Sequence, residues 1–231
     1  MKIRTVLFLL LLPMVSVGQL QIGLTCGYSW YWFTHTHDNG SEPEYNYSPA
    51  AYYLTLSARQ RSACTFNHGI AIEFTHRSFK VKSGWGGLGS HQWADFDYTI
   101  DNLYLHFQPQ FTFGSKLKFF IYPGIYFGTL LHSNLTGTIG SFNMAPYYSG
   151  TDTLNGNATG YYPKFEFGLA PGLGMEYPVS PQVNLIFETS FNLNLTDISG
   201  NWGADKSKML GVNVKLGAAY TFRSKKAKEK K

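Results

Sequence analysis

Strict alternation of apolar and polar residues is the feature that most constrains the fold of this chain. Residues 210–222 read LGVNVKLGAAYTF, with an apolar or aromatic residue at every even position and mostly small or polar residues between them. A period of two residues places successive side chains on opposite faces of an extended strand. The same alternation recurs over 20–33, 50–60, 69–79, 98–110, 117–131, 164–177 and 183–196. The sequence therefore predicts eight strands.

The predicted connections between these strands alternate in length. Those after the second, fourth and sixth strands are short, at 62–68, 112–116 and 178–182. Those after the other strands are longer and rich in Gly, Asn, Ser, Thr and Tyr, at 34–48, 80–96, 132–163 and 198–207. Short turns at one end and long loops at the other are typical of outer-membrane barrels. We therefore expect an all-β fold, an eight-stranded antiparallel transmembrane β-barrel with up-and-down meander topology, in the cell outer membrane of a bacterium.

The apolar face of the strands is expected to meet lipid. A soluble barrel would point that face inward, but eight strands leave an interior only wide enough for filling side chains. Charged residues make up 14% of the chain, against about 25% in soluble domains. The apolar residues therefore face outward, and small polar residues fill the lumen. Membrane-interface aromatics are predicted near the strand ends, at Trp30, Trp32, Tyr177, Tyr220 and Phe222.

Charged residues on the polar face form the candidate site. They are Arg59, Glu73, Arg77, Lys118, Glu166, Glu176, Glu188 and Lys215. Four are basic and four acidic, and buried charges persist when they are paired and hydrogen-bonded. We expect a structural charge network in a closed lumen; a proton or ion path is the alternative.

Three prolines lie within proposed strands, where each removes a ladder hydrogen bond. We expect a bulge or a strand end at Pro109, Pro123 and Pro171, with help from neighbouring glycines.

The two ends of the chain differ from the middle. Residues 1–18 combine Lys2 and Arg4 with a short apolar run and a small-x-small site, which predicts a cleaved signal peptide rather than a spanning helix of about 20 residues. Residues 19–222 are the barrel, and 223–231 are a basic periplasmic tail. The net charge of +5 comes from these ends, so we expect no nucleic-acid partner. Anionic lipid or a protein partner at the tail is an open alternative.

The sequence offers residue types for catalysis without a diagnostic spacing. His35, His91 and His132 could combine with Ser90, Ser133 and Asp95 in a lipid-modifying enzyme at the outer rim. The stretch 35–38 (HTHD) fits a solvated loop better than a metal site. We expect no catalytic residue, metal or cofactor. Cys26 and Cys64 are free thiols or a disulfide, and the sequence leaves both open.

Two stretches carry a family resemblance. NLYLHFQPQFTFGSKLKFFIYPGIYFGTLL (102–131) resembles a hallmark of the PorT-like outer-membrane β-barrel family. That family tends to show a Tyr-Leu-x-x-Pro strand, an aromatic-Gly turn with a basic residue, and then a Gly-aromatic strand. FEFGLAPGLGMEYPVS (165–180) and the closing YTF are similar to later strands of that family. Pro123 before Gly124 and the basic tail depart from the family pattern. The resemblance implies a barrel, and its namesake acts in protein secretion across the outer membrane.

These features together predict a non-enzymatic barrel with a structural or interaction role. The long outer loops, above all 132–163, are the expected contact surface for a protein partner. An accessory component of a secretion apparatus is the alternative implied by the resemblance, and a rim-sited lipid-modifying enzyme is a further one.

Overall fold

The computed structural model describes residues 19–35, 50–61, 66–87, 90–144, 147–159, 162–197 and 207–222. The strands in these residues are β1 (Gln19–His35), β2 (Ala50–Arg61), β3 (Phe66–Gly87), β4 (Ser90–Phe113), β5 (Lys118–Tyr122), β6 (Ile125–Met144), β7 (Tyr147–Asn157), β8 (Phe165–Leu169), β9 (Gly172–Pro178), β10 (Val183–Asn194) and β11 (Ser207–Phe222). No helix in this part of the chain is long and apolar enough to cross a membrane. The predicted signal peptide, the tail and Cys64 lie outside the described residues.

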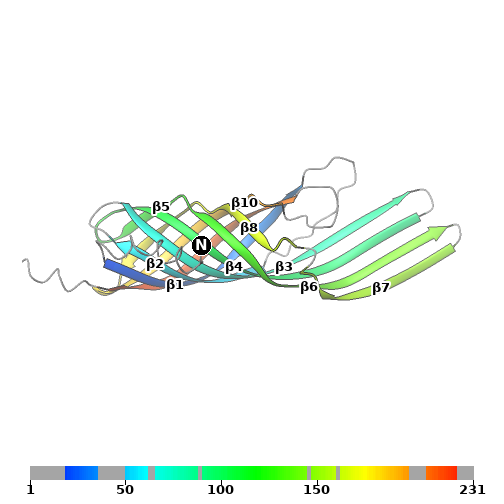
Figure 1. Ribbon diagram of the computed structural model, residues 1–231, viewed down its shortest axis with the longest axis horizontal. Helices are drawn as coiled ribbons and strands as arrows, with labels where there is room; N and C mark the ends of the chain where they lie inside the picture. Colours follow the sequence, from blue (N-terminus) through cyan, green and yellow to red (C-terminus); the bar gives the residue numbers. More distant parts are fainter. Residues whose placement is uncertain are drawn as a thin grey trace, which may run out of the picture.

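The strands close into a ring with eight positions (Figure 1). β1 pairs antiparallel with β2 on one side and with β11 on the other, and β11 pairs with β10. β5 and β6 together fill one position beside β4, and β9 and β8 together fill the next. The predicted eight-stranded antiparallel meander is therefore confirmed.

Prolines mark the two interrupted positions. Pro123 separates β5 from β6, and Pro171 separates β8 from β9. The ladder continues across both gaps, because Ala170 N–H donates to the Gly124 carbonyl at 2.7 Å and Phe191 N–H donates to the Pro171 carbonyl at 2.9 Å.

The expectation for Pro109 is wrong. Pro109 lies inside β4, and the register irregularity between β4 and β6 falls elsewhere, between Asp101 and Asn102. The register on either side of the β5–β6 gap places Pro109 opposite Pro123. Two residues without an N–H thus face each other across the ladder, so neither partner is left with an unpaired donor.

Three strands continue far beyond the barrel. β3, β4 and β6 contain 22, 24 and 20 residues, whereas about 9–11 residues suffice to cross a bilayer. Their outer parts (79–87, 90–100 and 133–144) join β7 in a four-stranded sheet, here called the arm, which projects from one end of the barrel (Figure 1). The prediction of loops at 80–96 and 132–163 is therefore wrong, since most of these residues form strands.

The polarity of the two faces inverts where the arm begins. In the barrel part of β4, the outward residues are apolar (Leu103, Leu105, Phe107, Phe111) and the inward ones are polar (Asn102, His106, Gln108, Gln110). Beyond Asp101 the outward residues are Thr99, Asp97 and Asp95, and the inward ones are Ile100, Tyr98, Phe96 and Ala94. The arm therefore does not continue the apolar outward face of the barrel, although its strands keep the same period of two.

The inner face of the arm holds a small hydrophobic core of its own. It consists of Ala94, Phe96, Tyr98, Leu135 and Ala158, with Phe79 packed against it. Phe79 stacks on Tyr98 with ring centroids 5.1 Å apart. Burial of these side chains stabilises the arm.

Candidate functional site

Large inward side chains lie opposite glycines and fill the lumen. The pairs in register are Tyr31–Gly211, Tyr53–Gly27, Tyr104–Gly128, Phe120–Gly174, Tyr122–Gly172 and Tyr126–Gly168. A Cβ added at any of these glycines would lie within 3.0 Å of the facing ring. Each ring therefore covers the backbone of the neighbouring strand, and an eight-stranded wall leaves little further space.

Glu166 is the centre of the outer charge cluster. Its carboxylate accepts hydrogen bonds from Asn102 Nδ2 at 2.8 Å, Tyr104 OH at 2.6 Å, Asn194 Nδ2 at 3.2 Å and Arg77 Nη2 at 3.3 Å. These four donors come from three further strands, β3, β4 and β10. Several strands are thus tied to one buried anion.

The Arg77 guanidinium of this cluster is also enclosed by aromatic rings. It lies 5.1 Å from the ring centroid of Tyr31 and 5.3 Å from that of Tyr104. Cation–π contacts of this kind help to hold a desolvated cation in place.

Lys215 joins two glutamates in the middle of the lumen. Its Nζ is 2.7 Å from Glu73 Oε2 and 3.6 Å from Glu188 Oε1. Glu73 also accepts from the Thr55 hydroxyl at 3.0 Å, and Glu188 from Tyr122 OH at 2.6 Å. The cluster therefore pairs one cation with two anions and satisfies them further through hydroxyl donors.

Two arginines complete the network toward the turn end of the barrel. Arg59 contacts Glu188 at 2.8 Å and Glu176 at 3.4 Å, and Arg61 pairs with Glu176. Lys118 lies opposite Glu176 in register but makes no ion pair among those of the described residues. Arg61, which the sequence analysis did not include, therefore takes the place in the network that was predicted for Lys118.

Seven of the eight predicted lumen charges are therefore brought into the buried network. With Arg61 the ion pairs involve four bases and four acids, so the lumen balances its own charge. Sequence reasoning restricted to charged residues missed the neutral donors Asn102, Tyr104, Tyr122 and Asn194. The signal in the sequence was their alternate position along the strands, which places them on the same inward face as the charged residues.

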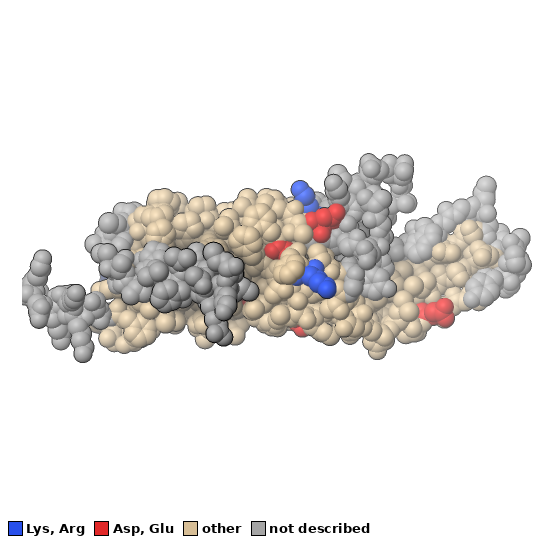
Figure 2. All heavy atoms as spheres, viewed as in Figure 1, with Lys and Arg blue, Asp and Glu red and all other residues tan. Residues whose placement is uncertain are grey.

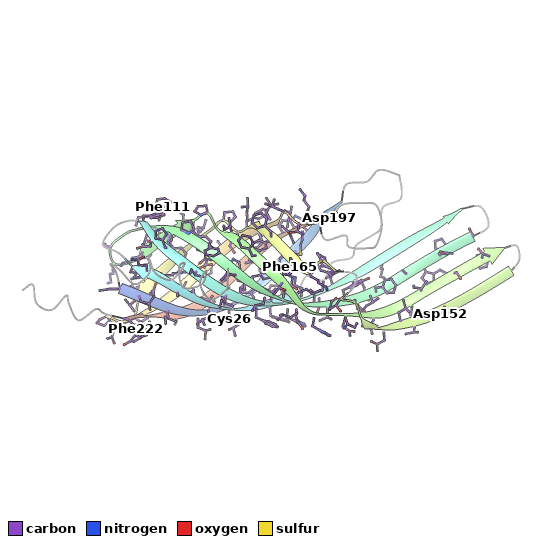
Figure 3. All side chains as sticks on the ribbon, in the orientation of Figure 1. Cys26, Phe111, Asp152, Phe165, Asp197 and Phe222 are labelled. Atoms are coloured by element: carbon purple, nitrogen blue, oxygen red, sulfur yellow. The ribbon has the colours of Figure 1, made fainter. Side chains whose placement is uncertain are left out.

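The outward wall is apolar over the barrel. Leu103–Phe113 covers about 25 Å along the barrel axis for a strand rising about 3.4 Å per residue at a tilt of about 40°. Phe111 and Phe222 lie on the outside of the wall in Figure 3, and most of the charged side chains visible in Figure 2 lie near the middle of the molecule, where the arm begins. Phe165 is also exposed. All five predicted interface aromatics (Trp30, Trp32, Tyr177, Tyr220 and Phe222) are outward and exposed.

Among the candidate catalytic residues whose side chains the structure describes, His91, His132, Ser133 and Asp95 are not brought together. His132 is exposed, whereas the adjacent Ser133 is completely buried on the other face of β6. His91 lies beside Trp93, and Asp95 pairs with Lys80 and Lys82. No three His, Cys, Asp or Glu side chains among the described residues could hold a metal ion.

The first cysteine and the histidine-rich stretch are the remaining candidates for chemistry. Cys26 lies exposed on the outward face of β1. Residues 36–38 of the histidine-rich stretch lie outside the described part of the chain.

Comparison with known proteins gives a family match and several similar solved structures. Residues 16–200 match the family described as outer membrane protein beta-barrel domain. Similar solved structures include OprG from Pseudomonas aeruginosa (14% identity, TM-score 0.45, covering 90% of this chain and 97% of that chain) and neisserial surface protein A (13%, 0.43, 88% and 97%). Ail of Yersinia pestis is a third (12%, 0.34, 90% and 100%). No curated protein sequence matches the chain.

Proposed function

The chain belongs to the outer-membrane β-barrel family and resides in the outer membrane, and on that premise we propose that it is a non-enzymatic barrel that acts through its arm. In this proposal the lumen is closed and serves stability. The arm stands outside the membrane and provides the surface for contacts with another protein. The contact surface is then a folded sheet and not the outer loops that the sequence led us to expect.

The inversion of polarity along β3 and β4 is the observation that carries this proposal. His76 and Asp101 lie where the outward face changes from apolar to charged, and their side chains are 2.7 Å apart on that face. On the barrel side of this pair the outward residues are Phe74 and Leu103, and on the arm side they include Lys80 and Asp97, which pair at 3.5 Å. An outward face bearing ion pairs suits water, so the bilayer ends at His76 and Asp101.

Cysteine labelling on intact cells tests where the arm lies. Single cysteines at Thr136 and Leu103, in a background with Cys26 and Cys64 replaced by alanine, would be treated with a membrane-impermeant maleimide. We expect rapid labelling at Thr136, on the arm, and none at Leu103, in the wall. Equal protection of both positions would contradict an exposed arm.

Conductance measurements test the closed lumen. The ion-pair network and the ring–glycine pairs support a plug without a water column, so the purified protein in a planar bilayer should give no steady ion current. A reproducible ohmic conductance for the wild type would overturn this part of the proposal and favour the ion-path alternative.

A second candidate is an accessory role in protein secretion, favoured by the PorT-like resemblance over 102–131. In the structure this stretch forms the end of β4, all of β5 and the first part of β6. Loss of secreted proteins from the medium after gene deletion would support that role. An unchanged lipid profile after alanine replacement of His35, His91 and His132 would speak against the lipid-modifying alternative.

A further inference from the structure

We propose that the free edge of β7 is a docking site that takes an extended segment of another protein by β-strand addition. The inference rests on the proposed function of the arm and makes it specific, because it names one edge and the kind of partner that fits it. Strand addition uses main-chain hydrogen bonds for affinity and alternate side chains for specificity.

β7 is the last strand of the sheet. Among the described residues it pairs with β6 alone, from Asn134 opposite Asn157 to Met144 opposite Tyr147. Every side chain from Thr151 to Asn157 is exposed. Within the described part of the chain, one side of the β7 backbone is therefore unpaired, on the part of the molecule that projects away from the barrel wall (Figure 1).

The hydrogen-bond pattern identifies which backbone groups point to this free side. Ala158 N–H donates to the Ser133 carbonyl at 2.9 Å and continues the β6–β7 register. Because backbone groups of successive residues in an antiparallel strand point to opposite sides, the even-numbered residues of β7 face β6. The N–H and C=O groups of Thr151, Thr153 and Asn155 consequently face outward from the sheet edge.

The two edges of the arm differ in their protection. Beyond Ser78, β3 has no described partner on its outer side and carries Lys80 and Lys82. Lysine is one of the residues that keep sheet edges from pairing. Both edges contain glycines, but β7 (YYSGTDTLNGN) contains no Lys, Arg or Pro. The β3 edge is thus protected against pairing with a further strand, whereas the β7 edge can accept one.

The side chains along β7 indicate which residue types a docking strand should carry. Leu154 is 39% exposed and Ile139, on the neighbouring strand and the same inner face, is 36% exposed. Asp152 shares that face, while Thr151, Thr153 and Asn155 lie on the other. The geometry fits a strand with alternating residues: apolar beside Leu154, basic beside Asp152, and hydroxyl or amide side chains on the opposite face.

Symmetry argues against a second copy of this chain as the occupant. Copies in one membrane stand the same way up, so β7 runs in the same direction in each. A two-fold axis along the membrane normal would then bring each carbonyl opposite the identical carbonyl at the same height, and no ladder could form. An unrelated extended segment is free of this constraint.

A proline at the free edge tests the proposal. Thr153→Pro removes an N–H that points away from β6, so the β6–β7 ladder keeps its bonds. Thr153→Val is the matched control, because it retains the N–H and a β-branched side chain. The probe is a fluorescent peptide with the sequence of Asn134–Met144 that carries Gly137→Val and Ile139→Lys, because in the β6–β7 register these two positions lie opposite Leu154 and Asp152. Binding to detergent-solubilised full-length protein would be followed by anisotropy.

We expect the wild type and Thr153→Val to bind the peptide with similar affinity and Thr153→Pro to bind at least about tenfold more weakly, the effect of losing a main-chain hydrogen bond of about 1.4 kcal/mol. No binding to the wild type, or equal binding to Thr153→Pro, would overturn the docking edge. A wild-type dimer that Thr153→Pro dissociates would overturn the choice of partner. Labelling at Thr136 tests the exposed arm separately, so failure of the edge and failure of the arm are distinguishable.

Discussion

Replacement of Lys215 by methionine would test whether the lumen network stabilises the barrel. Lys215 is 1% exposed, and its Nζ is the cation nearest to Glu73, at 2.7 Å. Glu188 keeps Arg59 at 2.8 Å after the change, whereas the described partners left to Glu73 are the hydroxyls of Thr55 and Thr75 and the His106 ring, whose Nε2 is 3.6 Å away. The cost therefore falls mainly on Glu73.

The expected loss is large for a single substitution. Removing one partner of a buried ion pair costs about 3–5 kcal/mol, because the other charge remains buried without compensation. With a urea dependence of about 1–3 kcal/mol per molar, a loss of about 3 kcal/mol lowers the unfolding midpoint by about 1–3 M. Tryptophan fluorescence during urea unfolding in lipid vesicles measures this shift.

Two further variants make the measurement decisive. Lys80→Met removes exposed ion pairs to Asp95 and Asp97 on the arm, and a surface pair contributes about 0–1 kcal/mol, so its midpoint should hardly move. Lys215→Met combined with Glu73→Gln removes both charges and should recover much of the loss. An unchanged midpoint for Lys215→Met, or a double variant that loses the sum of both single effects, would refute a network stabilised by pairing.

Two other predictions follow from the packing of the wall. Gly128→Ala should abolish the folded band on unheated gels, because the new Cβ would lie 2.2 Å from a ring carbon of Tyr104, whereas Gly156→Ala, with nothing within 4 Å, should fold normally; a folded Gly128→Ala variant would contradict the filled lumen. Ile125→Arg on the outward wall should cost about 2–4 kcal/mol of unfolding free energy, and Thr136→Arg on the arm should stay within about 0.5 kcal/mol; similar values for both would contradict a bilayer boundary at His76 and Asp101.

The sequence by itself determined the architecture of the wall. Alternation over stretches such as 98–110 assigned Leu103 and Phe107 outward and Asn102 and His106 inward, and the structure places them there. This succeeds because a strand has a fixed period of two, so the face of every residue follows from the face of one. The same parity assigned Glu73, Glu166 and Lys215 to the lumen without any knowledge of distances.

Only the tertiary structure decided the arm and the partners in the network. The outer half of β4 keeps the period and the parity of the barrel part, but there the apolar residues Phe96 and Tyr98 occupy the inner face and Asp97 the outward one. Alternation alone does not say which solvent a face meets. The choice of Arg61 over Lys118 for Glu176 likewise depends on cross-barrel distances. Parity is a local property of the backbone, whereas solvent and ion-pair partners depend on where residues far apart in the chain come together.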